Sequence, residues 1–224
     1  LFAGGKNATD APAQSGASSD INAPKTDAEY KKEDGLLDLQ KLKGTVLEES
    51  GAKDAAYLTD TVFVGDSNSE RLYMYQFISL NNFAGKSGMG IKNVTADACI
   101  YFKNDEKGYT IPQALAKMKP HRIVMTFGTN DAGGSMSAEN FIKSYKSAIS
   151  AIQKAYPHCD IIINTIPPVA KKRTYNNISM QTIDAFNVAL ADMAQELDLK
   201  LLNSNEFLRG EDGFGKPQYF DAKD

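Results

Sequence analysis

The sequence predicts an α/β protein in which helices cover both faces of a parallel β-sheet. Three short apolar runs, each closed by a turn, are typical of buried parallel strands; they are residues 61–64, 122–127 and 160–166. Segments of helical period separate these runs. Strands that alternate with helices of this length indicate βαβ units and therefore a parallel sheet.

Two apolar stripes mark the helices that follow the second and third runs. The first stripe is Phe141, Tyr145, Ala148, Ile149 and Ile152, with Ser137 as the predicted N-cap. The second stripe is Ile183, Phe186, Leu190, Met193 and Leu197. Residues 199–202 are predicted to form a last strand. The charged, leucine-containing segment 29–54 is predicted to form one or two short surface helices.

The 224 residues suit one domain with a tail. Residues 1–27 are rich in Ala, Gly, Ser, Asp and Asn without apolar periodicity, which predicts a disordered linker before a domain over residues 28–224. Such a spacer often separates an export signal or a membrane anchor from a catalytic domain. We therefore expect an extracytoplasmic location, secreted or anchored at the cell surface, with an arbitrary start of the sequence as the alternative.

Charge and cysteine content exclude several classes of function. The 25 basic and 28 acidic residues give a net charge of -3, which gives no reason to expect nucleic acid or an anionic membrane as the partner. No apolar run approaches the ~20 residues that span a bilayer. Cys99 and Cys159 show neither metal-ligand spacing nor a disulfide framework. They are interpreted as buried free thiols, and a cystine is the alternative.

Polar residues follow two of the predicted strands, at the edge where parallel sheets place their functional loops. Gly65-Asp66-Ser67 follows the first strand. A serine in a tight turn between strand and helix is exposed, and backbone N–H groups at the helix N-terminus can stabilise a developing oxyanion there. The alternative is that Ser67 only caps a helix that begins near Ser69.

Gly128-Thr129-Asn130-Asp131 follows the second strand. The carboxamide of Asn130 can donate hydrogen bonds to an oxyanion without adding a charge, whereas the alternative for this residue is an Asx-turn that serves only loop geometry. Gly88 or Gly90 could present a further backbone N–H that no side chain covers.

These blocks resemble those of the SGNH/GDSL hydrolases. VFVGDSNSE (residues 62–70) is similar to the first block of that family, TFGTND (residues 126–131) to the third, and Gly88 to the glycine of the second. The resemblance covers residues 61–224. It implies a flavodoxin-like three-layer α/β/α sandwich, with Ser67 as the nucleophile and an oxyanion hole formed by the N–H groups of Ser67 and Gly88 and the side chain of Asn130. It also implies acyl transfer from esters to water without metal or cofactor.

The sequence departs from the family at its C-terminal end. The family takes its base and the orienting acid from an Asp-x-x-His block before a final helix, whereas this sequence ends in Phe-Asp-Ala-Lys-Asp. His121 and His158 open predicted strands and therefore belong at the opposite edge of the sheet, roughly 15–20 Å from Ser67. We expect Asp224 to open the missing block, and the histidine and the last helix to lie beyond the given sequence.

The leading hypothesis is serine-dependent hydrolysis of a small acyl ester, with acetyl groups on carbohydrate or on a cell-envelope polymer as the candidate substrate. A catalytically inactive SGNH-fold domain that binds glycans or scaffolds a surface assembly is the alternative. A phosphate or flavin site on a flavodoxin-like sheet is disfavoured, because the glycine-containing loops lack both Gly-Lys-Ser and GxGxxG.

Overall fold

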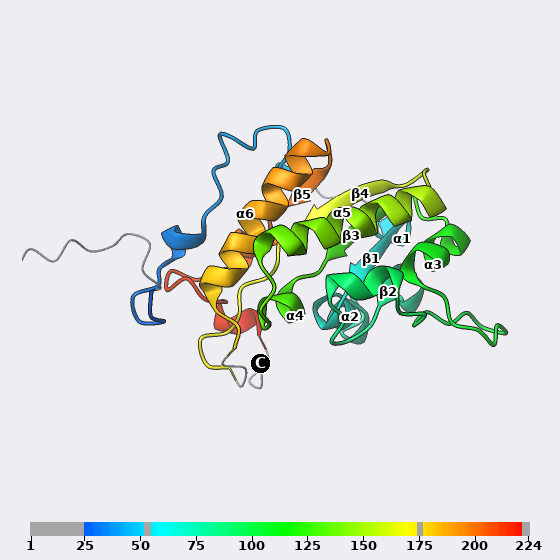
Figure 1. The fold of residues 1–224 in the computed structure, drawn as a ribbon, viewed down its shortest axis with the longest axis horizontal. Coiled ribbons are helices and arrows are strands. Elements are labelled where there is room, and N and C mark those ends of the chain that lie inside the picture. The colour runs from blue at the N-terminus through cyan, green and yellow to red at the C-terminus, as the bar shows by residue number, and fades with distance from the viewer. Residues whose placement is uncertain (1–24, 52–54, 174–176, 221–224) are drawn as a thin grey trace, which may run out of the picture.

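The computed structural model describes residues 25–51, 55–173 and 177–220 (Figure 1). Within them, the centre is a five-stranded parallel sheet in the order β2-β1-β3-β4-β5, which is the flavodoxin-like order. The strands are β1 (Thr61–Gly65), β2 (Phe83–Gly85), β3 (Arg122–Thr126), β4 (Asp160–Asn164) and β5 (Lys200–Leu202). The predicted parallel sheet is confirmed, and β2 is an edge strand that the sequence analysis did not identify.

Helices complete a three-layer α/β/α fold. They are α1 (Ala55–Thr59), α2 (Ser67–Met74), α3 (Ile111–Met118), α4 (Thr129–Ala132), α5 (Ala138–Ala155), α6 (Met180–Glu196) and α7 (Ser204–Leu208). Four 3-10 helices join them in the described residues: η1 (Lys32–Gly35), η2 (Leu80–Asn82), η3 (Ile91–Thr95) and η4 (Pro217–Tyr219). Helix α5 packs against both α3 and α6 (Figure 1). The connection from β1 to β2 runs along the sheet in the opposite direction to the later connections. Because such crossovers are right-handed, α2 lies on the face of the sheet opposite to α3, α5 and α6.

The two predicted helical stripes form the core side of α5 and α6. Ser137 caps α5 as predicted, since its hydroxyl accepts the Asn140 N–H at 3.2 Å. All five residues of the first stripe are buried. In the second stripe, Leu197 differs: it is the C-cap, where the chain leaves α6, and is 37% exposed.

The prediction of surface helices over residues 29–54 is wrong for most of that segment. Over residues 29–51, which the structure describes, there is only the 3-10 turn η1, and Val46 forms a parallel bridge with Leu201 of β5. The Leu47 N–H donates to Leu201 O at 2.8 Å, and the Leu201 N–H donates to Thr45 O at 2.9 Å. The β-branched Thr45 and Val46 thus pair with the free edge of β5, which outweighs their weak helix preference. Residues 52–54 lie outside the described residues, and so do residues 1–24 of the predicted linker. The boundary between linker and domain therefore stays a prediction.

A buried ion pair joins the N-terminal segment to the C-terminal half of the domain. The Arg209 guanidinium is fully buried and pairs with the Asp184 carboxylate of α6. Arg209 Nε also donates to Asn205 Oδ1 at 2.9 Å, and the Tyr30 hydroxyl donates to Asp184. Since each buried charge has several partners, this cluster fixes residues around Tyr30 against α6 and α7.

Both cysteines are unpaired, but they are half-buried rather than buried as predicted. Burial nevertheless raises the pKa of both thiols, so they are poor nucleophiles at neutral pH. Among the helices that the structure describes, none is long and apolar enough to cross a membrane.

Candidate active site

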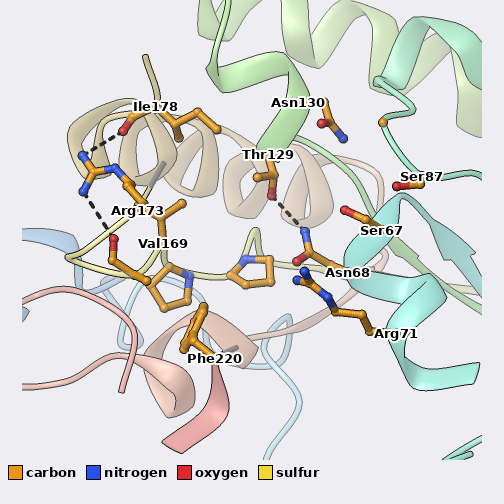
Figure 2. Close-up of a pocket in the computed structure, with 14 residues that line it drawn as sticks. Ser67, Asn68, Arg71, Ser87, Thr129, Asn130, Val169, Arg173, Ile178 and Phe220 are labelled. Carbon is orange, nitrogen blue, oxygen red and sulfur yellow. Dashed lines mark hydrogen bonds between the residues drawn. The ribbon is translucent and has the colours of Figure 1, made fainter. Parts of the chain in front are cut away.

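A pocket of about 280 Å³ opens at the carboxyl edge of the sheet (Figure 2). Polar residues line one side: Ser67, Asn68, Ser87, Gly88, Thr129 and Asn130. The opposite wall contains Pro167, Pro168, Val169, Ile178 and Phe220. The pocket therefore brings together three of the four predicted site residues, Ser67, Gly88 and Asn130, which follow three different strands.

Ser67 is the first residue of α2 and is half-buried at the pocket. The helix cap is Asp66, whose carboxylate accepts the Asn68 N–H at 2.9 Å, so the alternative that Ser67 is the cap is wrong. Gly65 makes the tight turn possible: a Cβ there would overlap both the Ser69 side chain and the Thr126 carbonyl oxygen. The hydroxyl of Ser67 is left available to a substrate in the pocket.

The Asn130 side chain connects two other loops of the site. Its Nδ2 donates to Asp66 Oδ2 at 3.0 Å and to the Met89 carbonyl oxygen at 3.1 Å. An Asx-turn would instead bond the local backbone, so these contacts argue against that alternative. Asn130 is exposed and directs a carboxamide toward the pocket that also holds Ser67 (Figure 2).

Gly88, rather than Gly90, is the glycine at the pocket. Its φ of 75° lies in the left-handed region that disfavours residues with a Cβ, and nothing lies within 4 Å of the position that a Cβ would occupy. Gly90 has a φ of -94° and is the N-cap of η3. The backbone conformation therefore explains why a glycine stands at position 88 at the mouth of the pocket.

Asp131 holds the loop that carries Gly88. Its two carboxylate oxygens accept the Ile91 N–H at 3.2 and 3.1 Å. Burial raises the pKa of Asp131, and the charge of Lys92 partly opposes that shift. Together with the bond from Asn130 to Met89 O, this contact attaches the Gly88 loop to the loop after β3 at two points.

Asp131→Ala is expected to lower stability before it affects chemistry. The change leaves the buried Ile91 N–H without its acceptor, which costs about 1–3 kcal/mol of the free energy of unfolding. Asp131→Asn keeps an acceptor oxygen and is the matched control, with a smaller loss. Urea unfolding of both variants measures the difference. Unchanged stability together with a lower kcat would assign Asp131 to the reaction itself.

Asp66 is the most deeply buried carboxylate at the site, at 1% exposure. Burial raises its pKa to about 6, and the nearby Asp131 adds to the rise, whereas hydrogen bonds from Asn68 and Asn130 oppose it. Asp66 therefore changes its charge near neutral pH, directly behind Ser67 and in contact with Asn130.

The structure places neither histidine near Ser67, as predicted. His121 is exposed and lines a hollow with Thr59 and Asp60, at the amino ends of the strands. His158 is also exposed, two residues before β4, with its ring 5.9 Å from that of Tyr156. Asp224 lies outside the described residues.

Three features of the pocket were missed by the sequence analysis. Asn68 donates through Nδ2 to Thr129 Oγ1 at 3.1 Å and so joins the two motif loops. Ser87 brings a second hydroxyl to the pocket. The wall after β4 is shaped by Arg173, which donates to Ala170 O at 3.3 Å and to Ile178 O at 3.1 Å (Figure 2). The one available signal was Pro167-Pro168 at the carboxyl end of a strand.

No group of three or more His, Cys, Asp or Glu side chains is placed to hold a metal ion in the part of the chain that the structure describes. What the pocket offers is a serine hydroxyl, a carboxamide and an exposed glycine backbone.

A parallel three-layer fold with Gly-Asp-Ser and Gly-Thr-Asn-Asp at one edge of its sheet defines the SGNH class of hydrolase folds. The chain belongs to the GDSL-like Lipase/Acylhydrolase family, whose model matches residues 52–222. The resemblance found in the sequence is thereby confirmed, and the family supports a hydrolase that acts on esters.

Solved structures agree with this fold. A candidate platelet activating factor from Streptococcus pneumonia matches with a TM-score of 0.55 and 17% identity, over 72% of this chain and 73% of that chain. A candidate acylhydrolase from Bacteroides fragilis matches with a TM-score of 0.54 and 17% identity, over 78% and 88% of the two chains. At this level of identity the likeness shows the fold alone. A search of curated protein sequences found no match.

Proposed function

We propose that this protein hydrolyses carboxylic esters with Ser67 as the nucleophile. One observation carries the proposal: a single pocket contains Ser67, Gly88 and Asn130, which come from the loops after β1, β2 and β3. Attack of Ser67 Oγ on the ester carbonyl carbon would place negative charge on the carbonyl oxygen. The N–H groups of Ser67 and Gly88 and the Asn130 carboxamide are the donors proposed to stabilise it. The bond to the alcohol then breaks, the alcohol leaves with the proton taken from Ser67, and water hydrolyses the acyl-Ser67 ester to the free carboxylic acid.

The reaction also needs a base, because a serine hydroxyl is a weak nucleophile at neutral pH. Neither histidine lies at the pocket. In the family's pattern the base follows an acid in an Asp-x-x-His block, and Asp224 is the residue proposed to open that block. The same observation favours one alternative function, a catalytically inactive domain that binds acylated glycans in this pocket.

The dimensions of the pocket support a small acyl group. About 280 Å³ is just below the ~300–1,000 Å³ that hold drug-sized ligands. The wall of Pro167, Val169 and Phe220 offers apolar contact for a methyl or short alkyl group. We propose an acetyl or similarly short ester on a carbohydrate or cell-envelope polymer as the substrate. The extracytoplasmic location that goes with such a substrate rests on the composition of residues 1–27.

Activity on 4-nitrophenyl esters is expected to decline as the acyl chain grows. We expect an acetyl group to be held beside Ser67 by the wall of Pro167, Val169 and Phe220, and an octanoyl chain to be held less productively. We expect kcat/KM to fall at least about tenfold from acetate to octanoate, since each tenfold change needs only about 1.4 kcal/mol. A rise in kcat/KM with chain length would contradict the assignment to short acyl groups.

Covalent labelling tests the serine mechanism and separates it from the binding alternative. A fluorophosphonate should modify Ser67 alone, as read by mass spectrometry of tryptic peptides. Ser87, in the same pocket, and the buried Ser69 are internal controls, because neither is proposed to be activated. Labelling at Ser87 would reassign the nucleophile. Binding of acetylated oligosaccharide without any labelling would favour the inactive glycan-binding domain.

A further inference from the structure

The buried Asp66 carboxylate has no part in the ester hydrolysis described above, yet it contacts the group assigned to the oxyanion. Asn130 Nδ2 donates to its Oδ2 at 3.0 Å. Its other oxygen, Oδ1, accepts the backbone N–H of Asn68 at 2.9 Å and Asn68 Nδ2 at 3.1 Å. Asp66 thus collects three donors from two loops of the site while being 1% exposed.

An ionised carboxylate can only accept hydrogen bonds. A carboxamide beside it must therefore present its NH₂ group and turn its own oxygen away. The Met89 carbonyl oxygen, at 3.1 Å from Asn130 Nδ2, imposes the same orientation from the neighbouring loop. These two acceptors take both N–H groups of Asn130 in the resting structure, so an oxyanion must replace one of them, and the neutral Met89 carbonyl is the weaker acceptor of the two.

We propose that Asp66 is a positioning residue for the oxyanion hole: in its ionised form it holds one N–H of the Asn130 carboxamide, so that the second N–H, which bonds to Met89 O in the resting structure, can donate to the ester oxygen instead. This inference rests on the proposed function. Protonation of Asp66, or its replacement by Asn, puts a donor in the place of one acceptor oxygen. The contact with Asn130 then becomes donor against donor, and one of the two contacts that orient the amide is lost.

The surroundings of Asp66 keep this carboxylate close to its titration point. The pKa of Asp66 is raised to about 6, mainly by burial and also by the charge of Asp131 on α4, while the donors Asn68 and Asn130 oppose the rise. Tyr145 on α5 also faces both carboxylates, whose charges raise the pKa of that phenol, as its burial does. Lys92 on η3 acts on Asp131, and Arg71 lies one turn further along α2 at the pocket. Asp66 therefore loses its negative charge within the pH range in which an enzyme can work.

A double-mutant cycle tests whether Asp66 acts through Asn130. Asp66→Asn should lower kcat by about 10- to 100-fold with little change in KM, as small misplacements of catalytic groups do. In the Asn130→Ala background the same change should cost less than about twofold, because the group that Asp66 positions is already gone. Asp184→Asn removes a buried carboxylate of the Arg209 cluster that does not line the pocket, and controls for general loss of stability. Equal factors in both backgrounds, or an unchanged kcat, would overturn the inference.

A second measurement needs no turnover and so separates this inference from the proposed function. The side-chain NH₂ resonances of Asn130, assigned by their loss in Asn130→Ala, should shift with an inflection near pH 6 in the wild-type protein. The inflection should disappear in Asp66→Asn, while the NH₂ resonances of Asn164, which donates to Thr126, serve as a reference. Absence of the inflection in the wild type, or its persistence in Asp66→Asn, would overturn the positioning role. Absence of ester turnover with the inflection present would count against the hydrolase alone.

Discussion

Ser67→Ala is expected to abolish ester turnover while leaving the fold intact. The side chain is half-buried at the pocket, and the cap of α2 is Asp66, so removal of the Ser67 hydroxyl breaks no capping bond. Without Oγ no acyl-enzyme can form, and the remaining donors can act only on direct attack by water. Loss of a nucleophile in well-studied serine hydrolases costs up to ~10⁶ in kcat, so the fall should reach the detection limit of an activated-ester assay.

Ser69→Ala is the matched control for this change. Ser69 lies two residues further along α2, is 2% exposed, and packs against Gly65 instead of the pocket. Its replacement should cost some stability and leave kcat within about threefold, since it makes no contact with the reacting atoms. Thermal midpoints measured beside the kinetics distinguish unfolding from loss of chemistry. Equal activity of Ser67→Ala and the wild type would refute the assignment of the nucleophile.

Much of the sheet could be predicted from the sequence. Three of its strands are compact apolar runs, and a fourth directly follows a helix with a regular apolar stripe. Strand β2 could not: it has only Phe83, Ala84 and Gly85, and pairs with β1 alone at the edge of the sheet. The segment around Val46 was misassigned for a related reason. Its pairing with Leu201 joins residues far apart in the sequence, and local periodicity contains no information about such contacts.

The candidate site, like the sheet, contains residues that could be predicted from the sequence and contacts that could not. Ser67 and Asn130 could be selected because each stands in a short motif after a predicted strand, and Gly88 because of its resemblance to the glycine of the family's second block; the structure brings all three to one pocket. The contact between Asp66 and Asn130 could not be foreseen, since 64 residues separate them and the bond exists only when the loops after β1 and β3 meet. The apolar wall from Pro167 and Phe220 likewise depends on tertiary packing.

The second large effect is expected for Asn130→Ala, with a fall in kcat of ~10²–10³ and a change in KM below about twofold. The reason is that a donor to the oxyanion acts on charge that is absent from the ground state. The resting structure already satisfies Asn130 Nδ2 through Asp66 and Met89 O, so this side chain is held in place before substrate arrives. Only the contact with Met89 O has to be exchanged for the oxyanion as charge develops in the transition state, while the contact with Asp66 is kept.

The same replacement also has a cost for the folded state, which must be separated from the kinetic effect. Asp66 Oδ2 loses its donor, and because that hydrogen bond lowers the pKa of Asp66, its loss should raise that pKa further. Asn68→Ala is the matched control: it removes a donor from Oδ1 of the same carboxylate but leaves the Asn130 carboxamide in place. Both variants should lose about 1–3 kcal/mol or less in urea unfolding, whereas only Asn130→Ala should lower kcat by more than about tenfold. A loss confined to KM in Asn130→Ala would mean that Asn130 binds the substrate in its ground state and does not stabilise the oxyanion.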